Sequence, residues 1–291
     1  MPEGPPPLPP QPDIYKAAED TYVIPNVLEA PPIGLIYFNT LVIRGKEPTI
    51  VDTGAPIFRQ DWLSRIGTIV DLDDVKWIFL SHDDRDHSGN VVQALAACPN
   101  ATLLTTWFSV GRMADEWSLP PHRIRFLYDG ESLDVGDRTF GIFRPPFFDS
   151  PVTLSLFDSL NKLYWSVDTF ATNMSFMPQN VEEIKRDEWR EGVFLANRLN
   201  HPWHEWLDKD KWFKVVDRVQ SLGIETVAGC HTPMIKGPMI EDAFKLIRQI
   251  PDMEPWSQPS QAEFEALVAA MMADPPPQPS WRVEGGAAPA G

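Results

Sequence analysis

Cysteine is scarce in this sequence. The 291 residues include only two, Cys98 and Cys230. Two thiols are too few for a disulfide framework or for a zinc site built from cysteines. We therefore expect reduced thiols in a reducing compartment, and hence a cytoplasmic protein.

Positive charge is also in short supply. Lys and Arg total 25 against 41 Asp and Glu, which gives a formal charge of -16. A surface with this balance repels phosphate backbones and anionic lipid headgroups. We therefore expect neither nucleic acid nor a membrane surface as a partner.

Long apolar runs are absent as well. No segment reaches the roughly 18 apolar residues that a membrane span needs. The first residues, MPEGPPPLPPQPD, contain neither the basic nor the apolar part of a signal peptide. The expectation is a soluble chain.

Proline, by contrast, is plentiful at both ends of the chain. Pro-rich segments favour extended conformations without a core, so we expect disorder at residues 1–19 and 275–291. Between them, short apolar or alternating segments are interleaved with helical patterns, such as residues 87–99 and 210–223. This order predicts one α/β domain over residues 20–250.

A further helical pattern follows the predicted domain, in residues 251–274. Ser260 and Glu263 form a capping-box pattern ahead of apolar residues at helical spacing, among them Phe264 and Val268. We expect a C-terminal helical extension that docks on the core.

The densest group of chemically active side chains follows a short apolar run. In IFLSHDDRDHSGN, residues 78–90, a predicted strand is followed at once by His82, Asp84, Asp86 and His87. This is the end of a strand at which α/β folds place functional residues. Imidazole and carboxylate ligate zinc, iron or manganese, and carboxylates this close repel one another without a cation. The alternative is an acidic loop that caps the following helix.

The loop resembles the metal motif of the metallo-β-lactamase superfamily, His-x-His-x-Asp-His, with Asp84 in the second His position. An acidic residue there resembles the His-x-Glu-x-Asp-His variant of the flavodiiron proteins and their stand-alone oxygen-binding relatives. Three segments fit the same branch: TIVDTG with Asp52, YWSVDTFA with Asp168, and VAGCHTPM with His231. The resemblance covers roughly residues 20 to 250. It implies a four-layer αββα sandwich with the ligand loops at one edge of two sheets.

One histidine of that family pattern is missing. The family has a third His between the first loop and the bridging aspartate, but this chain has none between His122 and His201. The family spacing leads to Asp149 in RPPFFDSPV from either side, so a carboxylate would replace the imidazole. The alternative is that Asp149 only caps a turn ahead of Pro151.

The resemblance implies a ligand set for two metal ions. Site one would comprise His82, Asp84 and Asp149, site two would comprise Asp86, His87 and His231, and Asp168 would bridge them. Four carboxylates neutralise two divalent ions, and oxygen-rich ligand sets favour iron or manganese over zinc. We expect two iron ions, with manganese or zinc as alternatives, and we expect Asp168 and Asp86 to be catalytic.

Other polar residues have simpler interpretations. His201 and His204 fall in a stretch that resembles a connection between two late helices, so we expect packing or surface residues. Cys230 adjoins His231, but a lone cysteine is more often a small buried hydrophobe than a nucleophile.

Three functions remain open. The first is a diiron oxidoreductase that binds O2 or nitric oxide and reduces or activates it, with the carboxylate at position 149 favouring an oxygenase that acts on an organic substrate. The second is a zinc-dependent hydrolase of esters, thioesters or lactones. The third is a diiron sensor that binds O2 or nitric oxide without turnover. For the first we expect an external electron donor, because no phosphate-binding loop of a flavodoxin is found. The oligomeric state stays open, with a homodimer as one option.

Overall fold

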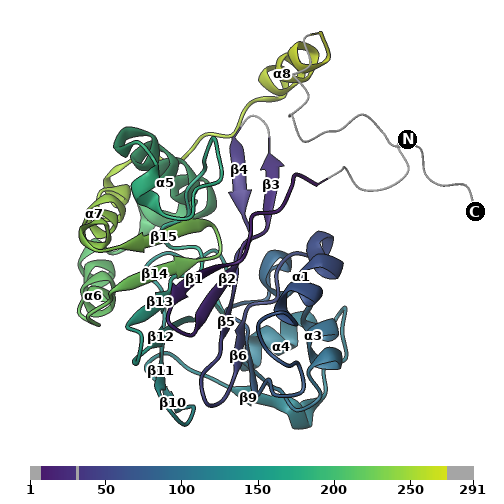
Figure 1. The fold of residues 1–291 in the computed structure, drawn as a ribbon. Coiled ribbons are helices and arrows are strands. Elements are labelled where there is room, and N and C mark those ends of the chain that lie inside the picture. The colour runs from purple at the N-terminus through teal and green to yellow at the C-terminus, as the bar shows by residue number, and fades with distance from the viewer. Residues whose placement is uncertain (1–7, 31–32, 274–291) are drawn as a thin grey trace, which may run out of the picture.

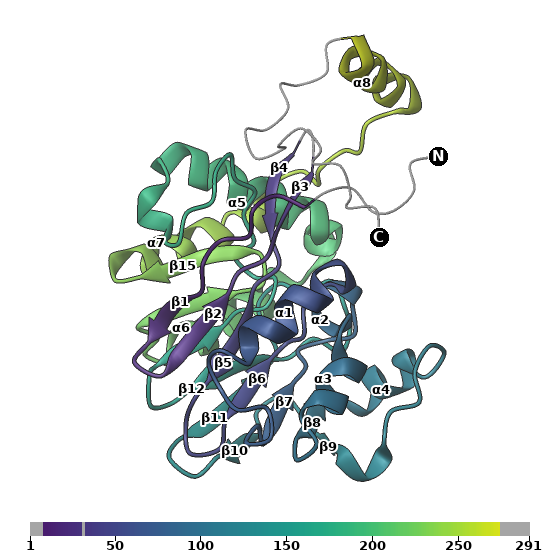
Figure 2. The same cartoon turned by 45° about the vertical axis from the view of Figure 1, so that its right-hand side comes forward.

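Two β-sheets lie face to face, and helices cover the outer face of each (Figure 1, Figure 2). The computed structural model describes residues 8–30 and 33–273. The arrangement is the four-layer αββα sandwich that the sequence predicted. Of the segments predicted to be disordered, residues 1–7 and 275–291 lie outside the described residues. Within the predicted segment 1–19, residues Tyr15–Ala18 form a strand, so the prediction is wrong there.

The first sheet comes from the N-terminal half of the chain. Its strand order is β1-β2-β5-β6-β7-β8-β9. The strands are β1 (Tyr15–Ala18), β2 (Thr21–Ile24), β5 (Thr40–Ile43), β6 (Thr49–Val51), β7 (Trp77–Phe79), β8 (Thr102–Thr105) and β9 (Ile124–Phe126). The strands from β1 to β6 pair antiparallel, and those from β6 to β9 pair parallel. Its helices are α1 (Arg59–Ile66), α2 (Arg85–Ser88), α3 (Val91–Ala97) and α4 (Trp107–Met113).

The second sheet comes from the C-terminal half. Its strands, in spatial order, are β10 (Ser132–Asp134), β11 (Thr139–Phe143), β12 (Ser155–Asp158), β13 (Leu163–Trp165), β14 (Thr226–Gly229) and β15 (Thr232–Lys236). Only β13 and β14 pair parallel in this sheet of the described chain. Its helices are α5 (Arg186–Asn200), α6 (Lys209–Gln220) and α7 (Pro238–Ile247).

Smaller elements complete the description. A hairpin of β3 (Val27–Ala30) and β4 (Gly34–Tyr37) projects from the sandwich (Figure 1). Short 3-10 helices are η1 (Pro56–Phe58), η2 (Pro121–Arg123), η3 (Val181–Glu183), η4 (Pro202–Trp206) and η5 (Ile250–Asp252). Among the described residues, no helix has both the length and the hydrophobicity that a membrane crossing requires.

Side chains on the central strands are buried on both faces of each sheet. In β5, Leu41 and Ile43 pack in the cluster between the sheets, while Val42 packs in the cluster under the helices of the first sheet. Alternate residues of a strand point to opposite faces, so a strand covered on both sides must be apolar throughout. This is why the central strands appear in the sequence as continuous apolar runs.

A buried ion pair joins the two sheets at the end opposite the carboxyl end of β13. The guanidinium of Arg138 lies 2.9 Å from Asp158 and also pairs with Asp20, which lies in the turn between β1 and β2. The three residues link β-turns of both sheets. Strand β1 pairs with β2, and the turn between them is held by this ion pair. Strand β1 is therefore part of the sandwich, although it precedes residue 20, where we expected the domain to begin.

The C-terminal helix does not dock on the core. Helix α8 (Gln261–Ala273) forms where the capping box indicated, and the backbone N–H of Ser260 donates to Glu263 at 2.8 Å. However, its apolar side chains Phe264, Val268 and Met272 are exposed, and the helix stands apart from the sandwich (Figure 1). The predicted docking is wrong, because an apolar stripe of a helix does not specify the surface that covers it.

We expect deletion of residues 260–291 to change the free energy of unfolding by less than about 0.5 kcal/mol, because α8 buries little against the sandwich. Chemical denaturation of the full and shortened chains measures this difference. A loss above about 1 kcal/mol would show that the helix docks in solution.

Candidate metal centre

Four of the predicted ligands lie in the segment that follows β7. His82 and Asp84 precede helix α2, and Asp86 and His87 lie on it. The helical turn brings the ring of His87 within 3.9 Å of the ring of His82, measured between centroids. Asp84 is the N-cap residue of α2, yet its side chain makes no capping hydrogen bond. The loop therefore lacks the contact that a purely capping role would need.

The first donor group consists of His82, Asp84 and Asp149. The Nε2 atom of His82 lies 3.6 Å from a carboxylate oxygen of each of Asp84, Asp149 and Asp168. These separations are too long for hydrogen bonds, and they are close to the ~3 to 3.5 Å expected between two ligands of one metal with bonds of about 2.1 Å. Within the described chain, His82 Nε2 and Asp168 Oδ2 are buried without a hydrogen-bond partner.

The second donor group consists of Asp86, His87 and His231. The Nε2 atom of His231 lies 3.0 Å from Asp86 Oδ2 and 3.3 Å from Asp168 Oδ1. The Nε2 atom of His87 lies 3.2 Å from the same Asp168 oxygen and 3.5 Å from Asp86 Oδ2. Asp168 thus turns one oxygen toward each donor group, and it is only 1% exposed.

Close contact between two backbone segments brings Asp168 and His231 together. A Cβ atom at Gly229 would lie 2.4 Å from the hydroxyl of Ser166 and 3.0 Å from the carbonyl oxygen of Val167. Only glycine lets β14 approach the end of β13 this closely. Val167 itself has a φ of 56°, a left-handed conformation that is rare for a β-branched residue.

Hydrogen bonds to the far side of two imidazoles fix their orientation. The Nδ1 atom of His231 lies 2.6 Å from the carbonyl oxygen of Tyr37. A carbonyl can only accept, so Nδ1 carries a proton and Nε2 is the nitrogen that faces the donor group. The Nδ1 atom of His87 lies 2.9 Å from Asp52 Oδ2 and is oriented by the same logic. Such outer contacts are typical of imidazoles that ligate metals.

Asp52 is itself held by a network of donors. The backbone N–H and the hydroxyl of Ser81 donate to it at 2.7 and 2.9 Å, and the indole N–H of Trp165 donates at 3.0 Å. Asp52 is fully buried and has a φ of 59°. The sequence identified Asp52 but missed Ser81 and Trp165. Ser81 could have been found as the neighbour of His82, whereas Trp165 carries no signal in the sequence.

Neighbouring acidic groups shift the pKa values of the imidazoles upward, against the effect of burial. Burial acts to lower the pKa of His87, but Cys230, Asp86 and Asp168 raise it well above its ordinary value. The pKa of His231 is raised well above its ordinary value against the same effect of burial, by Cys230 and by the same two carboxylates. The pKa of His82 is also raised, although burial and His87 oppose the rise. The cluster therefore favours protonated imidazoles when no cation is present.

The carboxylates respond in two directions. Burial alone would raise the pKa of Asp168, but His87 and His82 hold it well below its ordinary value. The pKa of Asp86 is likewise lowered against burial, chiefly by His87. Burial, followed by Asp168, raises the pKa of Asp149 to about 6. Of these three carboxylates, Asp149 is the one whose pKa is raised.

The structure brings together all seven side chains that the sequence singled out, Asp149 included. The Asp149 side chain is 32% exposed and accepts no hydrogen bond from the described residues of its turn. The turn is instead closed by the N–H of Thr153, which donates to the carbonyl of Ser150 at 3.2 Å. Its alternative role, capping the turn before Pro151, therefore lacks a contact to support it.

Three residues that the sequence did not assign to the metal centre are buried. Cys230 is fully buried, and its sulfur lies within 4.8 Å of donor atoms of Asp86, His87 and His231. His201 and His204 are also fully buried. His201 stacks on Phe147 at 5.2 Å and belongs to neither donor group.

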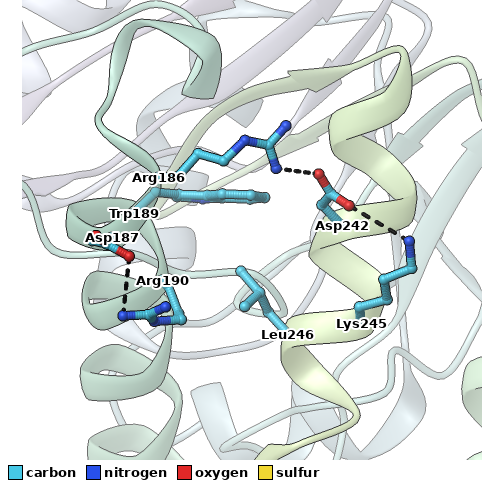
Figure 3. A pocket seen from close by; sticks show the side chains of 7 residues that line it. All are labelled: Arg186, Asp187, Trp189, Arg190, Asp242, Lys245 and Leu246. Atoms are coloured by element: carbon cyan, nitrogen blue, oxygen red, sulfur yellow. Dashed lines mark hydrogen bonds and ion pairs between the residues drawn. The ribbon is translucent and has the colours of Figure 1, made fainter.

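A cavity of about 230 Å³ opens beside the two donor groups, and its lining includes Asp86, Asp149 and His231. A separate hollow of about 320 Å³ lies between α5 and α7 (Figure 3). Its charges pair with one another: Arg186 with Asp242, and the two lining side chains Asp187 and Arg190 at 3.1 Å. Of these two hollows, the cavity beside the donors is therefore the better candidate for chemistry.

Comparison with known proteins identifies a matching family and relatives. A family model described as ODP family beta lactamase matches residues 36–232. A curated relative, putative diflavin flavoprotein A 1 of Nostoc sp., is 23% identical over 241 residues, which cover 81% of this chain and 39% of that protein. The chain thus spans about two fifths of the length of that relative.

Solved structures show the same fold. Rubredoxin oxygen:oxidoreductase from Desulfovibrio gigas superposes with a TM-score of 0.74 at 14% identity, over 84% of this chain and 63% of that one. The flavodiiron protein from Giardia intestinalis gives 0.73 at 17% identity, over 84% and 60%. The predicted resemblance to the flavodiiron branch of the metallo-β-lactamase superfamily is confirmed.

We expect protein stripped of metal to lose stability as the pH rises. The raised pKa values of His87 and His231 mean that their stabilising contribution is present below about 6.5 and is lost as pH rises through the folded-state values. Asp86 and Asp168, with lowered pKa values, contribute above about 3.9 and lose their effect as pH falls. Denaturant titrations of chelated protein at a series of pH values measure how the free energy of unfolding changes with pH. The expected slope is up to about 1.4 kcal/mol per pH unit for one proton.

The His87→Gln variant serves as the control. Its glutamine side chain cannot be protonated, so the loss of stability with rising pH should be smaller. Equal stability of the chelated parent at neutral and alkaline pH would contradict the expected charge balance.

Proposed function

Because the chain belongs to the ODP beta-lactamase family, we propose that it is a non-haem diiron oxidoreductase that reduces or activates O2. Support comes from two proteins whose structures have the same fold, an oxygen:oxidoreductase and a flavodiiron protein. Since a fold does not determine its chemistry, the proposal depends on the donor groups.

The observation that carries the proposal is the position of Asp168 between two donor groups. Each of its oxygens lies 3.2 to 3.6 Å from imidazole nitrogens of a different group. In the first group the facing atoms, His82 Nε2 and Asp168 Oδ2, have no other partner among the described residues. Buried polar atoms without partners are unfavourable unless a further group satisfies them. A metal ion in each donor group would do so.

The donor set favours iron over zinc. Asp84 and Asp149 stand where zinc enzymes of this superfamily would carry imidazoles, and together with Asp86 and Asp168 they supply four negative charges. Two divalent ions balance that charge, and oxygen-rich shells suit iron or manganese. Two iron ions bound here would supply the electron-transfer chemistry that reduction of O2 requires.

The chain's own residues would orient the donors and keep water out. Asp52 and the carbonyl of Tyr37 hold His87 and His231 with their Nε2 atoms toward the centre. The ring of Phe38 lies edge-on to His231 at 5.4 Å and covers one side of it. A hydrophobic shell of this kind limits solvent access to a metal centre.

We further propose that an organic substrate receives the activated oxygen. The support is the carboxylate at Asp149 and the adjoining cavity, whose volume of about 230 Å³ exceeds the needs of a diatomic gas. An external electron donor, homodimer formation and a cytoplasmic location also stay predictions. Both cysteines are free and buried, as a reducing compartment would allow.

The test is metal analysis of protein purified without added metal, followed by spectroscopy in air. We expect about two iron ions per chain and a near-ultraviolet charge-transfer absorption that bleaches on anaerobic reduction and returns with O2. Consumption of O2 with an added reductant measures turnover. The His87→Ala variant should lose metal and turnover, whereas His122→Ala, at an exposed position, should keep both.

Other outcomes select another function. Stoichiometric zinc without colour would support the hydrolase. Reversible binding of O2 without turnover would support the sensor.

Asp149 allows a sharper test of the ligand set. Asp149→Ala should lower the metal content by about one ion per chain, because removal of a ligand weakens affinity more than the roughly 10 to 100-fold lost with an outer-shell contact. Asp149→His should restore the metal and raise the reduction potential, because a neutral imidazole stabilises the oxidised centre less. Elemental analysis and redox titration are the measurements.

Asp115→Ala is the matched control, since Asp115 is an exposed carboxylate outside both donor groups. Two metals and full activity in Asp149→Ala would mean that Asp149 is not a ligand.

A further inference from the structure

The cavity beside the donor groups has two kinds of wall. One wall consists of Asp86, Asp149 and His231, which belong to the candidate metal centre. Other lining residues come from the segment around Phe38, directly after β4, and from the last turn of α5 around Leu199. A molecule in the cavity would therefore touch both donor groups and protein surface that plays no part in holding metal.

The walls away from the donors carry no charge. Among the described residues that line the cavity, none is Lys or Arg, and the acidic ones are Asp86 and Asp149 of the donor groups. Outside the donor groups, an anionic substrate would find no cationic side chain among the described lining residues, and a cationic one would find no carboxylate. Burying a charge without a partner is strongly unfavourable. The cavity therefore selects an uncharged molecule.

Most of the remaining lining is apolar, with two amides among it. Ile36, Phe38 and Leu199 provide hydrophobic surface. The amide N–H of Asn173 donates to the carbonyl of Ile33 at 3.1 Å, which leaves its oxygen free to accept. The side chain of Asn200 makes no hydrogen bond within the described chain, so it offers both a donor and an acceptor. Apolar walls with a few polar groups are typical of sites that bind and orient a small ligand.

The volume limits the size of the ligand. A cavity of about 150 Å³ holds benzene, and pockets for drug-sized molecules begin near 300 Å³. At about 230 Å³ this cavity has room for one ring with a small substituent.

We propose that this cavity binds the organic substrate, and that the substrate is a small uncharged molecule of about one ring, with an amide or hydroxyl group bound by Asn200 and Asn173. This inference rests on the proposed function, since two divalent ions are needed to neutralise the donor wall. It goes further by naming the substrate class and the residues that select it.

The test compares three probes of equal size and different charge: 4-fluorobenzamide, 4-fluorobenzoate and 4-fluorobenzylamine. Fluorine NMR on protein loaded with two zinc ions, which are diamagnetic and redox-inert, gives the affinity of each. We expect the benzamide to bind about tenfold more tightly than either charged probe. Tighter binding of the benzoate or the benzylamine would overturn the assignment of an uncharged substrate.

Variants on α5 locate the binding. Leu199→Trp should weaken the binding of 4-fluorobenzamide at least about tenfold by filling the cavity. Leu195→Trp is the matched control, because Leu195 lies on the same helix and lines a neighbouring hollow instead. Asn200→Leu should weaken 4-fluorobenzamide but leave fluorobenzene unchanged. If Leu199→Trp fails to fold, Asn200→Trp takes its place.

The outcomes separate the two proposals. In one outcome, the protein binds the benzamide, loses that binding in Leu199→Trp, and consumes no O2 in its iron form. That result would support the cavity site and contradict the proposed function. Turnover of O2 by a protein that binds none of the probes, or binds them equally in Leu199→Trp, would keep the function and overturn this inference.

Discussion

The buried carboxylate of Asp168 is the constraint on which the rest of the site depends. A charge in that position is strongly unfavourable unless other groups compensate for it. The compensation comes from His82 and His87 at the edge of the first sheet and from His231 in the second. The loops of the two sheets must therefore lie at the same edge of the sandwich. The apolar cluster packed between the sheets holds them in this relative position.

Part of this site can be predicted from sequence because it is local. Residues 82 to 87 form one segment, so their spacing after a strand indicates a shared face and a metal. Asp149 was located through the family spacing, and the structure places it 3.6 Å from His82. The contact of Trp165 with Asp52 joins residues 113 positions apart. It depends on how the two sheets stack, which no local pattern encodes.

The fold shows the same division between local and distant information. Patterns of strands and helices predicted the layers, and the capping box at Ser260 predicted the start of α8. Sequence patterns predicted neither the exposure of α8 nor the place of β1 in the sheet, because both depend on contacts with distant surfaces. The left-handed conformations at Asp52, Val167 and Phe170 could not be predicted from the sequence either, since none of these residues is glycine. Strain of this kind costs about 1–3 kcal/mol per residue and persists where surrounding contacts enforce it.

The division of the donors between the two halves of the chain has a consequence for biosynthesis. The first sheet is complete by β9, and with it come His82, Asp84, Asp86 and His87, but both donor groups still lack members. His231 follows β14, near the end of the second sheet, so a chain emerging from the ribosome cannot assemble either the sandwich or the full centre until β14 and His231 have been made. Metal capture would then be a late event that marks a finished fold, and a chain that stalls earlier would expose a cluster of carboxylates with no ion to hold.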